Sequence, residues 1–416
     1  MPRVSVFTPS HDPTYLDGCY ASLSAQTFTD WEWVVLLNGK AQRWSLAQPD
    51  ERVRIEHAPN RIKGVGAAKH LACEHATGEL LVELDHDDVI TPDCLAKVVE
   101  AFDANPHAVL VFSDFAQIEP DDSPNQERFA AEAGWVYSEV AIDGVSYLQC
   151  HSLEASPHNV AHIWYAPNHV RAFRRSAYEA IGGYNTDLVV LDDQDLMMRL
   201  YEIGDFVRIP ECLYLQRVHP RNTQRDPKLN AEIQQQTIEQ YRVGIEPLTL
   251  SWASRHGLEA VHLTTPTSVA VAPFDDRFTS VTIDPANPTL PFGDNEVGAI
   301  KAIDVLTRIP DRAAFLNECY RVLTHGGLLL SDTPSTDGRG AFQDPSNVAF
   351  YNENSFSYLT QEALRPAVPG LTARFQISHL VTYYPTAEHE QLGIPYVKAN
   401  LIAIKDGPRQ GGTLLV

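Results

Sequence analysis

The chain has 416 residues, 44% of them hydrophobic and 9% aromatic, and is therefore long enough to form two or more well-packed domains. Acidic residues outnumber basic ones by 54 to 32, so the net charge is −22 with the histidines neutral. A field of that sign repels phosphate backbones and anionic membrane surfaces, which argues against general nucleic-acid binding and favours bound metal ions.

The sequence carries no sign of a membrane span or of secretion. No run approaches the roughly 18 apolar residues that cross a bilayer, and the first residues enter a strand pattern without a signal peptide. The six cysteines are scattered and form no CxxC pair, a usage typical of reducing compartments. We therefore expect a soluble, cytoplasmic protein.

Apolar runs alternate with helical patterns in the first part of the chain. Strands are predicted at residues 4–8, 33–37, 53–56 and 80–84, and helices at 15–26, 66–76, 174–181, 193–201 and 228–242. A further helix is expected to begin with Thr91 as N-cap and Pro92 at N1. This alternation predicts an open, mainly parallel α/β sheet, which binds ligands at the carboxyl ends of its strands.

Residues 119–167 are rich in Pro, His and Ser and are predicted to be irregular. An irregular stretch of that length inside a compact domain is usually functional. Its histidines, His151, His158 and His162, lack the compact ligand spacing of a zinc site.

Three aspartates follow the predicted strand at residues 80–84. The segment LVELDHDD places Asp85, Asp87 and Asp88 at its end. Carboxylates two residues apart at a strand end can share a hard cation and reach a phosphate, and acids this close repel one another unless a cation neutralises them. An acidic turn in which Asp88 caps the next helix explains a bare DxDD at least as well, so the interpretation depends on the surrounding sequence.

The surrounding motifs are weak individually but occur in a characteristic order. They are VSVFTPSH at 4–11, QTFTDWEW at 26–33, ATGE at 76–79, PDCL at 92–95, RRSAYEAIGGYN at 174–185, LDDQDL at 191–196 and YLQRVHPRNT at 214–223. Together they resemble inverting glycosyltransferases of family two, which have a GT-A fold. The resemblance implies an enzyme that transfers a sugar from a nucleoside-diphosphate sugar to an acceptor hydroxyl.

The resemblance also implies a divalent metal, Mn²⁺ or Mg²⁺, bound to the diphosphate of the donor. Asp87 stands at the metal ligand, Asp85 reaches the metal or the ribose, and His219 approaches the metal from the other side. Such a metal neutralises the charge of the departing nucleotide. Asp88 is a substitute for either aspartate, and without the resemblance His219 would be interpreted as a surface or capping residue.

Asp193 falls at the catalytic base of the family, and Asp192 at a position that is usually glutamate. A positioned base that takes the proton of the acceptor contributes about 10²–10⁴ in rate. Capping of a helix explains both acids as well, and the two roles are compatible. The acceptor is expected at Asp192 and over Trp164 and the residues that follow it, Tyr165, Asn168 and His169, with a saccharide chain favoured. Packing in the core explains Trp164 equally well.

The nucleotide end departs from the family. Pro9, Ser10 and His11 are expected at the nucleotide, the last two where the family shows Thr-Tyr. Asn38 replaces a carboxylate that accepts the N3 proton of the base, and an amide oxygen can accept it too. A UDP-sugar is therefore favoured but the nucleotide stays open. Lys69, in place of an arginine, is expected at a phosphate.

A second α/β pattern follows from about residue 248. Strands are predicted at residues 260–263, 268–272, 280–283, 298–302 and 327–330, and a helix at 311–323 ended by His325-Gly326-Gly327. The segments TIDP, LPF, AIDVLTRIPD, YRVLTHGGLLL and GRGAFQDP, between residues 282 and 345, resemble class I S-adenosylmethionine-dependent methyltransferases. The Gly-x-Gly turn that opens such a domain is missing after Gly257, and side chains there would crowd the cofactor.

The chain is thus predicted to consist of a GT-A domain at 1–228, a helical linker at 229–247 and a Rossmann-like, methyltransferase-type domain at 248–416. The second domain is expected to be catalytically silent and to serve in acceptor binding, stability or dimerisation, so a homo-oligomer is compatible with the sequence. Two alternatives remain: a bifunctional glycosyltransferase and methyltransferase, and a non-catalytic nucleotide-sugar or glycan-binding protein.

Overall fold

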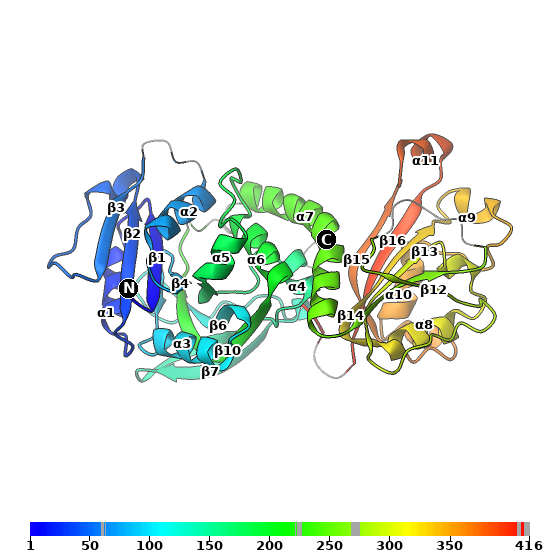
Figure 1. The fold of residues 1–416 in the computed structure, drawn as a ribbon, viewed down its shortest axis with the longest axis horizontal. Coiled ribbons are helices and arrows are strands. Elements are labelled where there is room, and N and C mark those ends of the chain that lie inside the picture. Colours follow the sequence, from blue (N-terminus) through cyan, green and yellow to red (C-terminus); the bar gives the residue numbers. More distant parts are fainter. Residues whose placement is uncertain are drawn as a thin grey trace. The chain divides into compact units, whose positions relative to one another are not determined.

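The computed structural model describes residues 1–59, 62, 64–220, 222, 227–267, 275–405 and 409–411. These form two compact units, Met1–Ile245 together with Gly411, and Glu246–Gln410 (Figure 1). The division falls inside helix α7 (Pro227–Arg255), which is longer than the linking helix predicted at 228–242. No helix among the described residues has an apolar stretch long enough to cross a lipid bilayer.

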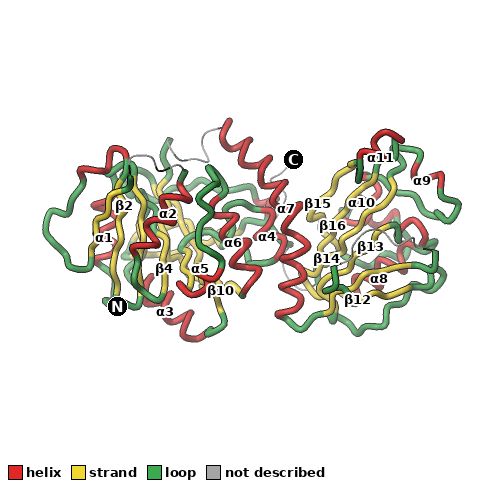
Figure 2. Tube along the Cα trace, turned by 45° about the horizontal axis from the view of Figure 1, so that its top comes forward, coloured by secondary structure: helices red, strands yellow, loops and turns green. Residues whose placement is uncertain are grey.

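A mixed sheet organises the first unit (Figures 1 and 2). The described strands follow the order β3-β2-β1-β4-β9-β6-β10-β5. Their bounds are β1 Val4–Ser10, β2 Trp31–Leu37, β3 Val53–His57, β4 Leu80–Glu83, β5 Val89–Ile90, β6 Ala108–Ile118, β9 Arg171–Arg174 and β10 Asp205–Arg217. The first four strands are parallel, as predicted, whereas β9 and β5 run antiparallel to their neighbours.

Helices cover this sheet, so its strands are buried on both faces and read as continuous apolar runs. Every residue of β2, WEWVVLL, is buried. The described helices of the unit besides α7 are α1 Leu16–Ser24, α2 Val65–His75, α3 Cys94–Ala104, α4 Pro157–His162, α5 Arg175–Ala180 and α6 Asp192–Ile203. Most of these lie within one or two residues of the predicted bounds.

Helix α3 begins later than predicted. Its N-cap is Asp93 rather than Thr91, and Pro92 precedes the helix. The hydroxyl of Thr91 donates to the Asp93 carboxylate at 2.9 Å, and the Thr91 carbonyl accepts the Cys94 N–H at 3.0 Å. Thr91–Cys94 therefore forms a turn that leads into the helix.

The stretch predicted to be irregular contains a β-hairpin. Strands β7 (Val136–Ile142) and β8 (Val145–His151) pair antiparallel, and β8 continues onto β6. Asp143 and Gly144 connect them with φ values of 49° and 80°, the backbone of a two-residue hairpin turn. The Asp143-Gly144 pair between two alternating runs is a sequence signal for such a hairpin, and a prediction based on composition overlooked it.

A second sheet organises the other unit, in the order β12-β11-β13-β14-β16-β15. Its strands are β11 Glu259–Thr264, β12 Thr279–Thr282, β13 Val297–Ile303, β14 Leu323–Pro334, β15 Phe375–Tyr383 and β16 Tyr396–Ala403, and its described helices are α8 Arg312–Val322, α9 Gly340–Gln343, α10 Glu353–Thr360 and α11 Ala387–Leu392. The first four strands are parallel, and β16 and β15 close the sheet antiparallel.

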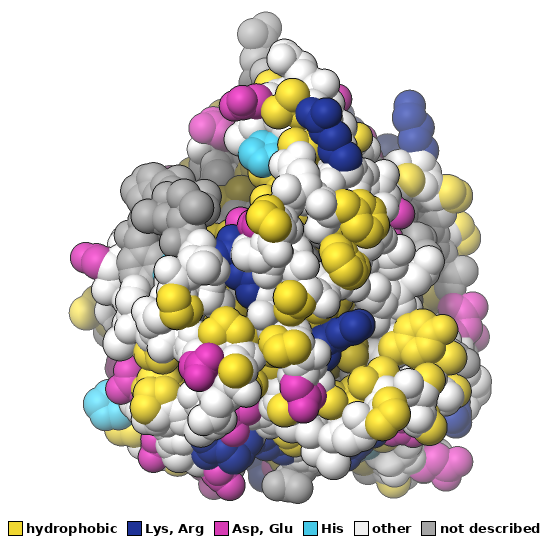
Figure 3. Space-filling view, turned by 90° about the vertical axis from the view of Figure 1, so that its right-hand side faces the viewer, with side chains coloured by type: hydrophobic (Ala, Val, Ile, Leu, Met, Phe, Trp, Pro, Cys, Tyr) yellow, Lys and Arg dark blue, Asp and Glu magenta, His cyan; other side chains and the backbone are white. Residues whose placement is uncertain are grey.

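The predicted elements of this unit are found with two exceptions. The strand predicted at 268–272 lies outside the described residues. Helix α8 is capped by the Asp311 carboxylate, but it ends at Val322, and His325-Gly326-Gly327 lies within β14 rather than forming a helix cap. Hydrophobic, acidic and basic side chains are interspersed on the face of this unit drawn in Figure 3.

The fold class expected from the resemblance is confirmed. Two α/β units follow one another in the chain, each built on a sheet whose first four strands are parallel.

Candidate active site

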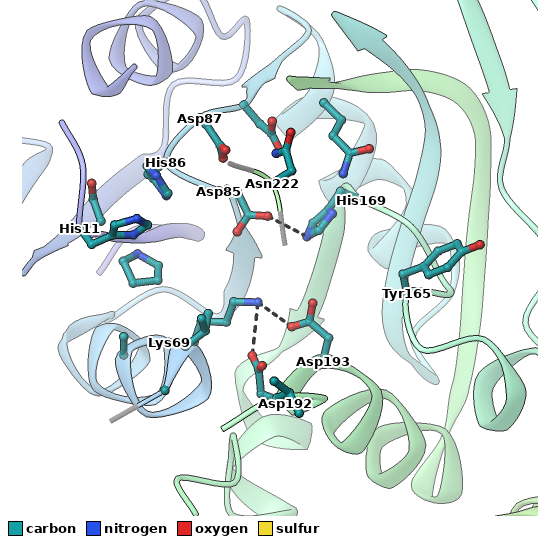
Figure 4. Close-up of a pocket in the computed structure, with 18 of the residues that line it drawn as sticks. His11, Lys69, Asp85, His86, Asp87, Tyr165, His169, Asp192, Asp193 and Asn222 are labelled. Atoms are coloured by element: carbon teal, nitrogen blue, oxygen red, sulfur yellow. Dashed lines mark hydrogen bonds and ion pairs between the residues drawn. The ribbon is translucent and has the colours of Figure 1, made fainter. Parts of the chain in front are cut away.

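A cavity of about 550 Å³ lies in the first unit, at the edge where β1 and β4 end (Figure 4). Its size is typical of small-molecule sites, and the carboxyl ends of parallel strands are where α/β sheets bind ligands. It is lined by all the residues that the sequence analysis assigned to the donor, metal, base and acceptor, namely Pro9, Ser10, His11, Asn38, Lys69, Asp85, Asp87, Trp164, Asp192, Asp193 and His219.

Asp87 and His219 meet in this cavity although 132 residues separate them in the chain. The Asp87 Oδ2 and His219 Nε2 atoms are 2.8 Å apart. Arg217 donates from Nε to the Asp87 carbonyl at 2.7 Å, and Tyr15 stacks on the His219 ring. Two ligands of one octahedral cation lie roughly 3 Å apart, so this pair fits a bound divalent metal.

Asp88 has a structural role. It is buried, accepting a hydrogen bond from the Tyr214 hydroxyl at 2.7 Å and one from the Arg217 N–H at 2.6 Å. Burial and the neighbouring carboxylates raise the pKa of Asp88. Asp88 is only 3% exposed, whereas the Asp193 side chain is 21% exposed, so Asp88 holds the turn after β4 rather than facing the cavity as a ligand.

Asp193 is held between two cations at the N-terminus of α6. The Lys69 Nζ atom is 2.5 Å from Asp193 Oδ1, and the Arg171 Nη1 atom is 2.6 Å from Asp193 Oδ2 (Figure 4 shows the lysine contact). Burial opposes ionisation, but the two cations outweigh it and hold the pKa of Asp193 below its ordinary value. Asp193 is therefore an ionised carboxylate whose position both cations define.

Glu83 is the second carboxylate that contacts Lys69 and Arg171. It is fully buried in β4, and the antiparallel register places it opposite Arg171 in β9. Its carboxylate lies 2.5 Å from Lys69 Nζ and 3.6 Å from Arg171 Nη1. The sequence analysis missed both Glu83 and Arg171, although an acid inside the apolar run LLVEL was a visible signal.

Lys69 therefore lies at the carboxylates rather than in open contact with the cavity. Its side chain is 4% exposed, and its ammonium also approaches Asp192 Oδ2 at 3.5 Å. Burial raises the pKa of Asp192 to about 7, although Lys69 opposes that shift. The two neighbouring acids of α6 thus differ in charge state: Asp193 is ionised and Asp192 titrates near neutrality.

A second set of possible metal ligands consists of Glu83, Asp85 and His169, whose ligand atoms lie within 4.8 Å of one another. Glu83 already contacts Lys69 and Arg171, so a divalent cation there would meet two positive charges. The Asp87–His219 pair has no lysine or arginine among the described residues at its 2.8 Å contact and stays the expected metal site, although Asp85 groups with Glu83 and His169 rather than with this pair. Of the three histidines in the stretch predicted to be irregular, His158 stacks on His162 with ring centroids 4.8 Å apart, and His151 Nε2 lies 2.9 Å from the Ser138 hydroxyl.

The end of the cavity where the nucleotide is expected contains a buried hydrogen-bond acceptor without a partner among the described residues. Asn38 Oδ1 is buried and has no hydrogen-bond partner among the described residues, while the Asn38 N–H donates to the Ser10 carbonyl at 2.8 Å. His11 and His86 pack edge to face nearby, with ring centroids 4.8 Å apart (Figure 4). A buried acceptor left alone costs about 1–3 kcal/mol, so a ligand N–H at this point would be stabilising.

In the second unit, a buried arginine contacts the two threonines that follow the first strand, β11. Arg308 is buried, and its Nη1 atom lies 2.7 Å from the Thr267 hydroxyl and 3.4 Å from that of Thr265. Its Nη2 atom lies 3.3 Å from the Asp344 carboxylate. Thr265 and Thr267 are the described residues that directly follow β11, and both thus lie within hydrogen-bond distance of Arg308.

Two family models match the chain, the first within the first unit and the second within the second unit. Residues 5–182 match the model of glycosyl transferase family 2, and residues 247–331 match that of a methyltransferase domain. Among curated relatives, chondroitin synthase of Pasteurella multocida (strain Pm70) is 24% identical over 54% of this chain and 21% of its own length. The O-antigen biosynthesis protein RfbC of Myxococcus xanthus is 25% identical over 51% of this chain and 16% of its own length. The chain thus spans about a fifth of these relatives.

Solved structures with a similar fold include residues 1–349 of S. aureus TarS, with a TM-score of 0.43 and 15% identity over 61% of this chain and 71% of that one. The mannosyltransferase PcManGT from Pyrobaculum calidifontis, in complex with GDP-Man and Mn²⁺, gives a TM-score of 0.38 and 20% identity. The match covers 62% of this chain and 76% of that one.

The buried position of Glu83 generates a stability prediction. Glu83→Gln removes one of the two carboxylates that Lys69 and Arg171 contact, the other being Asp193, and breaking such a buried pair costs about 3–5 kcal/mol. Urea denaturation of the full chain, followed by tryptophan fluorescence, measures this loss. Glu79→Gln is the control, because Glu79 pairs with Arg3 and Arg174 at the surface, where a pair contributes at most about 1 kcal/mol. Equal losses in both variants would contradict the assignment.

Proposed function

Because residues 5–182 are a glycosyl transferase family 2 domain and residues 247–331 match a methyltransferase domain, we propose that the chain is an inverting, metal-assisted glycosyltransferase. It moves a sugar from a nucleoside-diphosphate sugar, with a UDP-sugar favoured, to an acceptor hydroxyl. The observation that carries this proposal is that Asp87, His219 and Asp193 line one cavity.

Asp87, His219 and Asp85 would hold the metal, Mn²⁺ or Mg²⁺. Imidazole and carboxylate ligands suit such ions, and the 2.8 Å separation of Asp87 and His219 fits them. When bound, the metal neutralises the negative charge that develops on the departing diphosphate. Asn38, Ser10 and His11 are proposed to bind the nucleotide at the other end of the same cavity.

Asp193 is the proposed general base. The acceptor oxygen attacks the anomeric carbon from the face opposite the diphosphate, the new C–O bond forms as the old one breaks, and the hydroxyl proton passes to Asp193. The base must be ionised beforehand, which Lys69 and Arg171 ensure. The attacking oxygen becomes strongly acidic as its bond forms, so a carboxylate of low pKa is sufficient to take the proton.

A saccharide chain is the favoured acceptor. The relatives named chondroitin synthase and O-antigen biosynthesis protein support it, as do the aromatic residues Trp164 and Tyr165 in the cavity. A non-catalytic glycan-binding protein is the weaker alternative. Binding alone does not require a base, whereas Lys69 and Arg171 hold Asp193 ionised at the cavity.

We further propose that the second domain does not bind S-adenosylmethionine. The turn that should approach the cofactor contains threonines bonded to Arg308, and the Gly-x-Gly turn is absent from the sequence. This observation favours a single-activity enzyme over the bifunctional alternative.

Asp193→Asn is expected to lower sugar transfer by about 10²- to 10⁴-fold, because the amide cannot take the proton. The measurement is transfer from a panel of nucleotide sugars, together with the melting temperature. Asp195→Asn is the matched control: Asp195 lies in the same first turn of α6 but pairs with Arg199. Full activity in Asp193→Asn, or an equal loss in Asp195→Asn, would remove Asp193 from its role.

His219→Ala is expected to weaken Mn²⁺-dependent binding of UDP by about 10- to 100-fold, the range that even indirect metal partners show. Calorimetry of UDP binding with and without Mn²⁺ measures this. Chelation of the wild-type protein should give the same weakening and stop turnover. UDP affinity that does not depend on Mn²⁺ would rule out the metal site.

Calorimetry of the full chain with S-adenosylmethionine is expected to detect no binding tighter than about 1 mM. UDP with Mn²⁺ serves as the positive control in the same sample. A micromolar dissociation constant would instead support the bifunctional alternative.

A further inference from the structure

Aromatic side chains form the end of the cavity that lies away from His11. In Figure 4, Tyr165 and His11 stand at opposite sides, with Lys69, Asp85 and Asp193 between them. Phe129 and Trp164 line the cavity together with Tyr165. The Tyr165 ring is stacked with that of Phe129, with ring centroids 6.1 Å apart. It is perpendicular to the Trp164 ring, with centroids 5.1 Å apart.

Phe129 comes from the segment between β6 and β7, which the motifs of the sequence did not implicate. Its N–H donates to the Tyr137 hydroxyl at 2.7 Å, and its ring packs at 5.2 Å on Trp135, which is buried. Earlier in the segment, the buried Asn125 bonds to Glu119 and Glu127. These contacts fix the segment, so the Phe129 ring is held at the cavity without a ligand.

Arg171 connects the aromatic end to the proposed base. Its Nε atom donates to the Pro167 carbonyl at 2.8 Å and its Nη2 atom to the Tyr165 carbonyl at 3.3 Å. Its Nη1 atom binds Asp193 Oδ2 at 2.6 Å. One buried guanidinium therefore sets the position of the aromatic loop relative to the carboxylate.

The same loop carries a buried amide oxygen, that of Asn168. Asn168 lines the cavity, and its Oδ1 atom is buried without a hydrogen-bond partner among the described residues. A buried acceptor in this state is stabilised by any ligand that brings an O–H or N–H group.

We propose that Phe129, Trp164, Tyr165 and Asn168 form a subsite for a neutral pyranose, which we call the aromatic subsite. The apolar C–H face of the sugar packs on the rings, one of its hydroxyls donates to Asn168 Oδ1, and another lies toward Asp193. This inference rests on the proposed function and specifies the acceptor that the site takes.

The charges of the cavity favour a neutral sugar over a phosphorylated acceptor. Among the described lining residues, lysine and arginine are represented by Lys69 and Arg171, and both already contact carboxylates. An acceptor phosphate would therefore meet acids without an uncommitted cation. A pyranose offers what the walls can bind: an apolar face for aromatic rings and hydroxyl donors for an amide oxygen.

The test uses the full chain, saturated with UDP and Mn²⁺, and saturation-transfer NMR with methyl pyranosides of glucose, galactose, mannose and N-acetylglucosamine. At least one pyranoside is expected to bind, with saturation strongest on its ring C–H protons. Acyclic glucitol, which carries a hydroxyl on every carbon but has no ring face, is expected not to bind.

Phe129→Leu is expected to weaken pyranoside binding by roughly 2- to 12-fold, which corresponds to the loss of one aromatic contact. Phe342→Leu is the matched control, because Phe342 is an exposed phenylalanine of the second unit. Asn168→Ala should weaken binding to a similar degree, and Asn168→Asp should restore it because the acceptor oxygen returns. UDP affinity is measured in each variant and should not change, which shows that the variants fold.

The aromatic subsite would be ruled out by pyranoside binding that Phe129→Leu leaves unchanged, by equal binding of glucitol, or by binding of glycerol phosphate or a short prenyl phosphate in its place. Absence of pyranoside binding while UDP still binds would also overturn it and leave the proposed function standing. Pyranoside binding without hydrolysis or transfer from any nucleotide sugar would support the subsite and contradict the enzyme.

Discussion

The site depends on a buried cluster of charges in which Lys69 and Arg171 lie between Glu83 and Asp193. Burying any one of these groups alone would be costly, and the cost is offset only when each meets an opposite charge in good geometry. The pairing of β4 with β9 provides that geometry, because it places Glu83 opposite Arg171. The cluster therefore holds the carboxylate of Asp193 ionised and in a defined position.

Environment separates the acids of this cavity into different roles. Asp87 meets an imidazole and fits a metal site, whereas Asp88, its neighbour in sequence, is occupied by Tyr214 and a backbone N–H. Asp193 is ionised by two cations, while burial raises the pKa of the adjacent Asp192 to about 7. Residue type alone would not distinguish the members of either pair.

The two units of the chain differ in how they treat the carboxyl ends of their strands. In the first unit a cavity lies at these ends. Its lining includes the amide oxygens of Asn38 and Asn168, which are buried without a hydrogen-bond partner among the described residues and can accept from a ligand. In the second, Arg308 bonds to threonines in the turn after β11. The described residues that follow β11 are thus engaged in hydrogen bonds to a buried arginine, which favours the proposal that this unit does not bind S-adenosylmethionine.

The sequence by itself determined the four parallel strands β1 to β4, most of their helices and the α/β class, because these follow from local periodicity, while the GT-A fold and the cavity residues came from the family resemblance. It did not predict strands β6 and β10, which pair parallel to each other. It misplaced the start of α3 and missed the β7–β8 hairpin, where turn chemistry outweighed composition. Only the tertiary structure decided that Glu83 and Arg171 support Asp193, that Asp88 is structural, and that Phe129 reaches the cavity. These features depend on strand register and on contacts between residues far apart in the chain, which no local pattern encodes.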